Sequence, residues 1–373
     1  MDLKKERVAI VAAGAVIGVI AAMLVFFGNP ANMGFCIACF IRDTVGGLGL
    51  HRAEAVQYIR PEIVGLVLGS FLIAIGKGEW QARGGSAPLT RFVLGFCVMV
   101  GCLMFLGCPF RMILRVAGGD LNAVVGLVGF ACGILAGTWF LNHGYSLGRT
   151  YRLPASEGAA WPIIQVTILV LLVVAPAFIF FSPEGSGPGA KHAAIAISLA
   201  AMFGSILSLD PVSAVKMVVM WAIGGTLIYL AIKKDMEPSL LLPMGFGAIL
   251  VGALVTNLVL TATTGNAYFN LGFEGQPVAH NDAVWNFLGM ALAGLGCVLL
   301  GGCPLRQLVL SGEGNGDSAM ATLGLAVGAA FCHNFGLASS AKGATPAGQV
   351  AVVIGLVVVV AIACANSICK KKA

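Results

Sequence analysis

The sequence predicts an all-α polytopic membrane protein made of two inverted, pseudo-symmetric halves of about five crossings each, with re-entrant or broken helices. Composition predicts the class, because 58% of the 373 residues are hydrophobic and only 10% are charged, whereas soluble domains carry about 25% charged residues. A short motif that occurs once in each half predicts the repeat. The 51 glycines suit helices that pack closely or break inside a bilayer.

Apolar runs of roughly 20 residues, the length that spans a bilayer, predict the individual helices. The run at 62–76 and the region that ends at Cys108 are short, which is typical of tilted or half-helices in transporters. The candidate helices lie near 8–28, 62–76, 92–107, 122–142, 163–182, 192–209, 215–232, 239–262, 284–302, 318–338 and 347–368.

Lysines and arginines gather at the ends of the apolar runs, as in "DLKKER" at 2–7 and "KKK" at 370–372. The net charge of +6 therefore reflects membrane topology, and no nucleic-acid partner is expected. The distribution of basic residues predicts cytoplasmic N- and C-termini separated by roughly ten net crossings. The first apolar run is expected to be retained, because "GNPANMG" offers no good cleavage site for a signal peptidase.

The repeated motif is GCPxR, found at 107–111 and 302–306, an offset of 195 residues. Two halves with an odd number of crossings have opposite orientations, which is the signature of an inverted repeat. The predicted halves are 1–182 and 192–373, joined by a linker at 183–191. The residues that the offset aligns are Cys102 with Cys297, Cys108 with Cys303, Pro109 with Pro304 and Arg111 with Arg306.

The chemistry of GCPxR predicts a positive, thiol-lined constriction. Proline blocks helix continuation and glycine permits close approach, so each helix should break at its cysteine and turn the thiol toward the gap. Arg111 and Arg306 then supply fixed charge, and the combination suits a soft anion. The alternative is that each motif is only a helix end with an arginine at the membrane interface. A chance helix end, however, has no reason to repeat Gly, Cys, Pro and Arg together in both halves.

A second candidate element is "MGFCIACFIRD" at 33–43, which is too short to span and predicts a re-entrant loop. Its Cys36 and Cys39 have C-x-x-C spacing, but the βαβ setting of a thioredoxin and the four ligands of a closed metal site are absent from the pattern. Arg42 either pairs with Asp43 or faces the path and activates a nearby thiol. Most of the 11 cysteines lie in apolar runs, so reduced thiols are expected.

Two histidines lie beside apolar runs. His280 is expected in a loop near a helix start, where Asn281 or Asp282 can cap, whereas His333 is either a pathway residue or a hydrogen-bonded structural histidine. No catalytic residue, cofactor or metal is expected. The predicted solute pathway comprises Cys36, Cys39, Cys108, Arg111, Cys303, Arg306 and His333.

Four stretches carry a family resemblance: "GFCIACFIRD" at 34–43, "GCPFR" at 107–111, "FEGQPVAHNDAVWNFLGM" at 273–290, and "GGCPLRQLVLSGEGNGDSAM" at 301–320 with "CHNFGLAS" following at 332–339. Together they resemble the YeeE/YedE family of sulphur-compound transporters, specifically its YedE-type branch, to which selenium transport is ascribed. Family members with an assigned role take up thiosulfate along cysteine thiols in an hourglass-shaped path. The resemblance implies such roles for Cys36 or Cys39, Cys108 and Cys303, a bacterial inner-membrane location, and an accessory sulphur-carrier protein as a candidate partner.

One segment departs from that family. Its second half usually has a re-entrant cysteine loop, which the repeat places near 225–235, but this chain has no cysteine there. The stretch 228–251 instead resembles the β subunits of sodium-pumping carboxylic-acid decarboxylases. The leading expectation is a transporter, not an enzyme, for a small anionic sulphur or selenium solute. The alternatives are a membrane thiol–disulfide oxidoreductase that uses Cys36 and Cys39, and a cation-coupled decarboxylase subunit.

Overall fold

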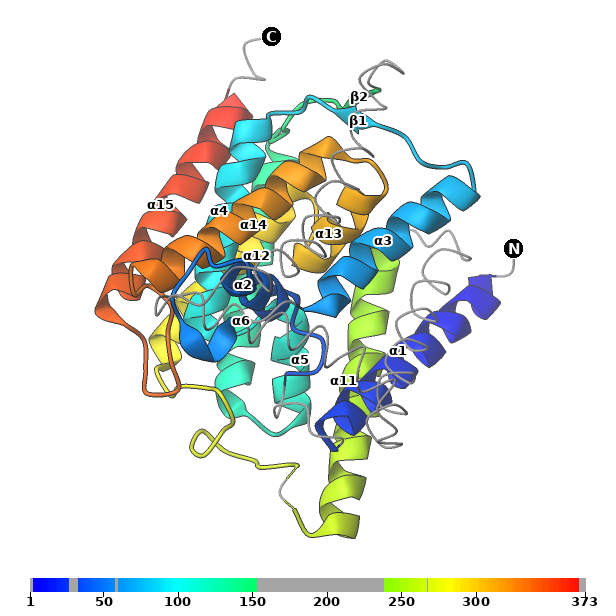
Figure 1. The fold of residues 1–373 in the computed structure, drawn as a ribbon, viewed down its shortest axis with the longest axis vertical. Coiled ribbons are helices and arrows are strands. Elements are labelled where there is room, and N and C mark those ends of the chain that lie inside the picture. Colours follow the sequence, from blue (N-terminus) through cyan, green and yellow to red (C-terminus); the bar gives the residue numbers. More distant parts are fainter. Residues whose placement is uncertain (1–2, 27–32, 58–59, 153–237, 267, 369–373) are drawn as a thin grey trace, which may run out of the picture.

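The computed structural model describes residues 3–26, 33–57, 60–152, 238–266 and 268–368 (Figure 1). The predicted linker and three candidate helices between 163 and 232 lie outside these residues. Nearly all regular structure in the described part of the chain is helical, which confirms the all-α class. Five of its helical stretches are long and apolar enough to cross a membrane, so the multi-pass prediction is confirmed as well.

The helix bounds follow the predicted apolar runs. Two short strands, β1 (Arg83–Gly84) and β2 (Tyr151–Arg152), pair antiparallel. The helices are α1 (Leu3–Phe26), α2 (Ile37–Gly47), the 3-10 turn η1 (Glu54–Val56), α3 (Pro61–Gly76), α4 (Pro88–Phe105), α5 (Pro109–Ala117), α6 (Leu121–Asn142), α11 (Pro238–Thr264), α12 (Ala283–Leu300), α13 (Pro304–Gly312), α14 (Gly316–Asn334) and α15 (Pro346–Ile368).

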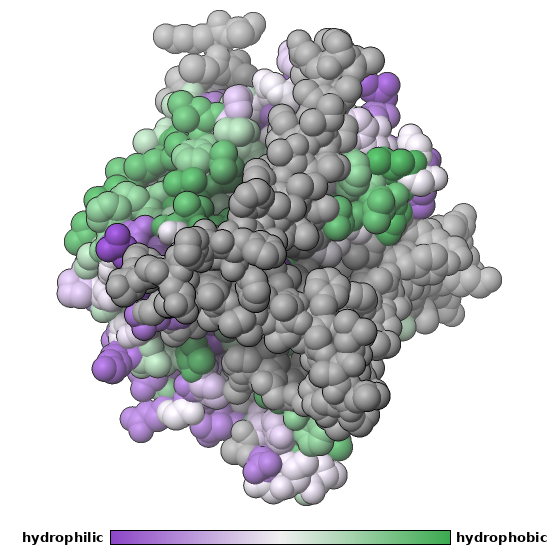
Figure 2. Space-filling view, in the orientation of Figure 1, coloured by the Kyte–Doolittle hydropathy of each residue, from purple (hydrophilic) through white to green (hydrophobic). Residues whose placement is uncertain are grey.

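The outer helices present apolar side chains to their surroundings. Val353 and Val357 of α15 are 47% and 64% exposed, and Leu135 of α6 is 70% exposed. Figure 2 shows a continuous hydrophobic face over α15 and its neighbour α14. Apolar patches of this extent are unusual on soluble proteins, and they fit a surface that lies in lipid.

Glycines let the helices of the two halves approach closely, and they do so at equivalent positions. A Cβ atom at Gly129 of α6 would overlap the Phe287 carbonyl of α12, and one at Gly324 of α14 would overlap the Phe92 carbonyl of α4. Both residues of the first pair are related to those of the second by the offset of 195. Helices α6 and α14, which are equivalent in the repeat, thus each pack on a long helix of the other half, with small residues at the contact.

Helix α2 lies near the centre of this assembly (Figure 1), against α3, α4, α13 and α14. All 11 of its residues are buried. Its length of about 16 Å is roughly half of the hydrocarbon thickness. A short helix buried on all sides is the local structure expected of the apolar stretch at 33–43.

Helices α1 and α11 lie side by side, on the opposite side of the molecule from α15 (Figure 1). Their contact also depends on glycine, because a Cβ atom at Gly18 would overlap the Ile249 carbonyl and one at Gly252 the Ala15 carbonyl. Part of the atypical stretch, 238–251, forms the start of α11, and its remainder lies outside the described residues.

Candidate functional site

The two GCPxR motifs form two helix breaks of the same geometry. Helix α4 ends at Leu106, which adopts left-handed φ/ψ values of 64° and 36°, and Cys108 is the N-cap of α5 with φ −79° and ψ 170°. Helix α12 ends at Gly301 with φ 82°, and Cys303 is the N-cap of α13 with φ −72° and ψ 169°. We call residues 106–108 the first break and 301–303 the second break.

The arginines of the motif satisfy the carbonyl groups that the breaks release. Arg111 Nη1 donates to the Leu106 carbonyl at 2.6 Å, and Arg306 Nη1 donates to the Gly301 carbonyl at 2.9 Å. Unpaired carbonyls are costly away from water, and a helix C-terminus attracts positive charge. Arg111 is fully buried and cannot be snorkelling to a membrane surface, whereas Arg306 is exposed.

The first break meets α2 in a buried thiol cluster of Cys36, Cys39 and Cys108. The sulphur atoms of Cys36 and Cys39 lie 2.7 Å apart, and Cys108 lies within interaction range of Cys36. Arg111 Nη1 lies 3.6 Å from the Cys39 sulphur. The two motifs, distant in sequence, therefore place three thiols and one guanidinium group together in the interior.

The second break lies within electrostatic range of two further thiols, Cys102 and Cys297. Cys303 is half-buried and within electrostatic range of Cys297. Cys102 is fully buried and within electrostatic range of Cys36, Cys39, Cys297 and Cys303. Cysteines of the two breaks thus belong to one buried region rather than to unrelated places. In the described part of the chain, no group of three or more His, Cys, Asp or Glu side chains is arranged to hold a metal ion.

Arg42 forms an ion pair with the next residue in the chain, Asp43. Its Nη2 lies 2.6 Å from an Asp43 carboxylate oxygen, and Arg60 Nε lies 2.9 Å from the other oxygen. Of the two expectations for Arg42, the structure shows the pair with Asp43. This buried ion network holds Arg42 within electrostatic range of Cys39, while the Arg111 guanidinium group contacts the Cys39 thiol directly.

His333 lies at the C-terminal end of α14 and stacks on His51, with 4.6 Å between ring centroids. His51 Nε2 donates to the Arg42 carbonyl at 3.0 Å, and burial lowers the pKa of His51 below its ordinary value. Among the contacts of the described residues, His333 is joined to His51 rather than to the thiol cluster.

Residues 276–282, which we call the cover segment, lie across the first break. The Val278 carbonyl accepts a hydrogen bond from Arg111 Nη2 at 3.4 Å, and His280 Nε2 donates to the Met104 carbonyl at 2.8 Å. Val278 has a φ of +50°, a conformation that costs a β-branched residue about 1–3 kcal/mol. The cover segment is therefore held in a strained form by its contacts with the first break.

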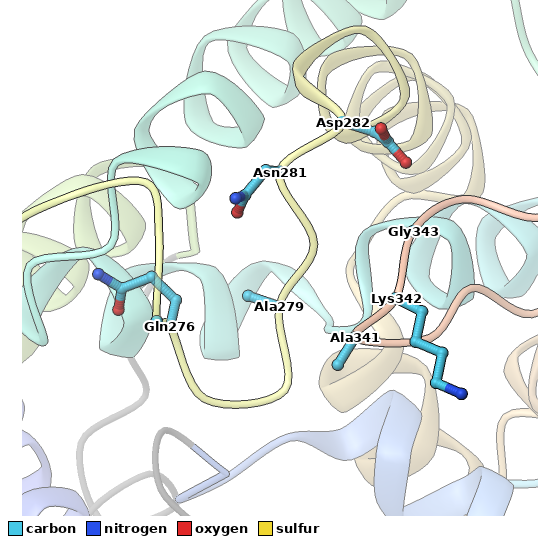
Figure 3. Close-up of a pocket in the computed structure, with 8 residues that line it drawn as sticks. Gln276, Ala279, Asn281, Asp282, Ala341, Lys342 and Gly343 are labelled. Carbon is cyan, nitrogen blue, oxygen red and sulfur yellow. The ribbon is translucent and has the colours of Figure 1, made fainter.

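A cavity of about 330 Å³ opens outside the cover segment. Figure 3 shows Gln276, Ala279 and Asn281 of the cover segment on one side and Ala341 and Lys342 on the facing loop. The cover segment thus contributes residues to the cavity lining and also contacts the first break through Val278 and His280. The complete lining is Gly275, Gln276, Ala279, Asn281, Asp282, Ala341, Lys342 and Gly343.

His280 and Arg115 belong to this region, and the sequence did not predict their roles. Asp282 occupies the N-cap position of α12 without making the expected side-chain cap, and His280 instead reaches back to α4. Arg115 Nη1 donates to the Phe105 carbonyl at 2.8 Å. One sequence signal for Arg115 exists, since it is a charged residue in an apolar run where the aligned Leu310 is apolar.

Substitution of His280 by alanine should open the cover segment. Burial lowers the pKa of His280 below 6.5, so at pH 7.5 the ring is neutral and donates to the Met104 carbonyl from Nε2. Removing this bond costs about 1–3 kcal/mol, because the carbonyl is left buried without its donor. Cys108 should then react at least several-fold faster with a membrane-impermeant thiol reagent, measured by peptide mass spectrometry.

The matched control is Asn281→Ala, which alters an exposed neighbour in the cover segment. It removes a 3.3 Å hydrogen bond from Asn122 but no bond to the first break, so the Cys108 labelling rate should stay within about twofold. Equal labelling of Cys108 in wild type and His280→Ala would show that the cover segment does not control access to the first break.

Comparison with known proteins gives one partial match. The family model of the Na⁺-transporting oxaloacetate decarboxylase beta subunit matches residues 216–311, about a quarter of the 373 residues. In the described part of the chain, this region covers α11, α12, the second break and most of α13. No curated protein matches the chain. The match agrees with the resemblance expected at 228–251, and it supports a membrane transporter or membrane subunit in general terms.

Proposed function

We propose that this protein is a membrane transporter, not an enzyme, that takes up a small sulphur- or selenium-containing anion along a cysteine-lined path. The observation that carries the proposal is the buried cluster of Cys36, Cys39 and Cys108 with Arg111 at 3.6 Å from the Cys39 sulphur. The proposed path continues through the second break, with Cys303 and Arg306 at its far end. His333, also predicted for the path, lies against His51 at 4.6 Å between ring centroids.

The chemistry of the cluster fits an anion with a soft end. Thiols are weak hydrogen-bond donors with polarisable sulphur, so they interact better with a sulphur or selenium atom than with a strongly hydrated oxyanion alone. A guanidinium group presents planar donors that match oxyanions and is more weakly hydrated than an ammonium group. Together they offset part of the cost of removing water from the anion.

The resemblance to the YeeE/YedE family supports the same proposal from the motifs. The resemblance implies a bacterial inner-membrane location and a sulphur-carrier protein as a candidate partner. The distribution of basic residues supports cytoplasmic termini, and the repeated motif supports two inverted halves. The exposed apolar side chains of α6 and the hydrophobic face over α15 (Figure 2) agree with a bilayer as the surroundings.

Uptake of labelled thiosulfate and selenite into proteoliposomes tests the proposal. Wild-type protein should take up at least one of the two solutes. Cys108→Ala and Cys303→Ala should each lower uptake at least about tenfold, which corresponds to about 1.4 kcal/mol of lost interaction with the anion. Cys132→Ala and Cys364→Ala are matched controls, because both cysteines are exposed on outer helices, and each should remain within about twofold of wild type.

Absence of thiosulfate and selenite uptake by correctly folded wild-type protein would overturn the proposal. Equal uptake by all four cysteine variants, at equal amounts of protein in the membrane, would leave transport in place but remove the thiols from its mechanism. The two breaks would then only end helices.

Thiol–disulfide exchange is a second candidate, favoured by the 2.7 Å distance between the Cys36 and Cys39 sulphur atoms. Against it, exchange needs access for an attacking thiolate, and both cysteines are at most 1% exposed. This candidate predicts that Cys36 and Cys39 are indispensable and form trapped mixed disulfides, whereas Cys303 is dispensable. Trapping with a partner dithiol distinguishes the two functions.

A cation-coupled decarboxylase subunit is the third candidate, favoured by the family match at 216–311. In the described part of that region, helices α11, α12 and α13 contain no Asp or Glu, whereas hard cations are bound mainly by oxygen ligands, often carboxylates. Labelled sodium flux in proteoliposomes without any thiosulfate or selenite uptake would favour this candidate over the transporter.

A further inference from the structure

The two halves differ in charge at one pair of equivalent positions. Arg115 and Asp120 form an ion pair in the first half, with Arg115 Nε 2.6 Å from the carboxylate. The offset of 195 places Leu310 and Asn315 at these positions in the second half. Both partners of the ion pair are fully buried.

The backbone around the two pairs is the same. The Asp120 amide donates to the Arg115 carbonyl at 3.0 Å, and the Asn315 amide donates to the Leu310 carbonyl at 3.0 Å. Asp120 caps α6 by accepting from the Asn122 amide, and Asn315 caps α14 in the same way through its own side chain. The turn therefore forms equally well with leucine and asparagine.

The ion pair is thus not required by the fold of this turn. Burying two charges carries a desolvation penalty, and buried ion pairs can often be replaced by apolar residues without loss of stability. Because Leu310 occupies the position equivalent to Arg115, the buried charge of Arg115 needs an explanation other than the fold of the turn. Buried arginines inside membrane segments commonly mark substrate or ion pathways.

The Arg115 guanidinium group has an unused donor. Nε donates to Asp120 and Nη1 donates to the Phe105 carbonyl at 2.8 Å, while Nη2 is buried without a hydrogen-bond partner among the described residues. Buried polar groups nearly always have a partner in native structures. An unused guanidinium donor indicates that an acceptor belongs beside it.

The free donor belongs to the same region as the thiol cluster. Arg115 is four residues after Arg111 on α5, so the two side chains lie on one face of that helix. Arg115 is within electrostatic range of both Arg111 and Cys36. An acceptor for Arg115 Nη2 is therefore in a position to meet a second guanidinium group and the thiols.

We propose that Arg115 binds the transported anion through Nη2 and forms, with Arg111, a site for a small oxyanion that carries two negative charges and a soft sulphur or selenium atom. This inference rests on the proposed function and specifies its substrate class. Asp120 holds the Arg115 side chain in place through Nε and leaves Nη2 to the substrate. The second half, with Leu310 and Asn315, has no equivalent of this site.

The test compares three variants that introduce residues of the second half into the first: R115L, D120N and R115L/D120N, each in full-length protein in proteoliposomes with labelled thiosulfate and selenite. The double variant leaves the net charge unchanged and copies a turn that the chain already forms, so it should fold. It should raise KM at least tenfold with Vmax changed less than threefold. D120N should raise KM less than R115L does, because Arg115 keeps Nη2 for the anion but loses the carboxylate oxygen that holds Nε.

A wild-type KM in R115L/D120N would overturn the inference while leaving the proposed function in place. Equal losses in D120N and R115L would also overturn it, because the ion pair itself would then be the important feature. A second readout is the stabilisation of detergent-solubilised protein by thiosulfate, measured as a Tm shift, which should disappear in the double variant. Wild-type protein that shows neither uptake nor stabilisation would instead overturn the proposed function.

Discussion

Arg111→Ala is expected to reduce thiosulfate or selenite uptake by a factor of about 100 or more. The Arg111 side chain is fully buried and contacts the Leu106 carbonyl, the Cys39 sulphur and the Val278 carbonyl. A hydrogen bond that involves a charged group contributes about 1.5–3 kcal/mol, and each 1.4 kcal/mol corresponds to about a factor of ten in binding. Initial uptake rates in proteoliposomes, normalised to incorporated protein, measure the effect.

Arg111→Lys separates two ways in which the guanidinium group acts. If long-range charge attracts the anion, lysine should restore much of the rate. If planar, paired donors are needed, lysine should be nearly as inactive as alanine, because an ammonium group is a point charge with different geometry.

Arg306→Ala is the matched comparison, since Arg306 caps the second break but is exposed to solvent or lipid head groups. Arg306→Ala should lower uptake less than Arg111→Ala. Solvent screens an exposed charge, so its interactions contribute less free energy than those of a buried charge. A larger loss in Arg306→Ala than in Arg111→Ala would place the decisive constriction at the second break.

The helices could be predicted from the sequence because apolar runs of bilayer length leave few alternatives. The two breaks could be predicted for a related reason: proline after cysteine ends a helix whatever surrounds it, and both α5 and α13 begin at the motif proline. These features depend on local covalent properties. Local properties are what a single sequence records most directly.

The contacts of the cover segment could not be predicted, because they depend on where distant segments meet. His280 reaches Met104, 176 residues away, and nothing in "QPVAHND" specifies a partner on α4. The same holds for Arg111, whose bond to Val278 spans 167 residues. The glycine positions, by contrast, are a sequence signal for the helix contacts, since Gly129 and Gly324, which the repeat aligns, make equivalent contacts.

The asymmetry of the two halves follows from a few substitutions on an equivalent backbone. Arg111 is buried and Arg306 exposed, although both donate to the carbonyl of the C-cap residue at their break. The thiols of α2 lie at the first break, and the stretch where the repeat expects their counterparts, 225–235, has no cysteine. The first break therefore has the more complete set of groups for holding an anion.

Gly324→Leu is expected to prevent stable folding rather than to impair transport selectively. A Cβ atom at Gly324 would overlap the Phe92 carbonyl oxygen, and backbone cannot move aside as a flexible side chain does. Overpacking of well-packed interfaces typically costs about 1–3 kcal/mol, and a clash with backbone between α14 and α4 should exceed that range. The loss of monodisperse protein in size-exclusion chromatography, and a Tm lower by more than about 5 °C in any protein recovered, measure the effect.

Gly129→Leu should have the same outcome, because Gly129 meets the equivalent carbonyl of Phe287. Gly65→Leu is the matched control: a Cβ atom there meets no described atom within 4 Å, so leucine should fold normally and can stabilise α3 through its higher helix propensity. If Gly324→Leu folds like Gly65→Leu, α4 and α14 are not in direct contact at this point. If Gly129→Leu and Gly324→Leu differ widely in stability, the α6–α12 and α14–α4 interfaces are not equivalent. That result would contradict the structural repeat at these helix contacts.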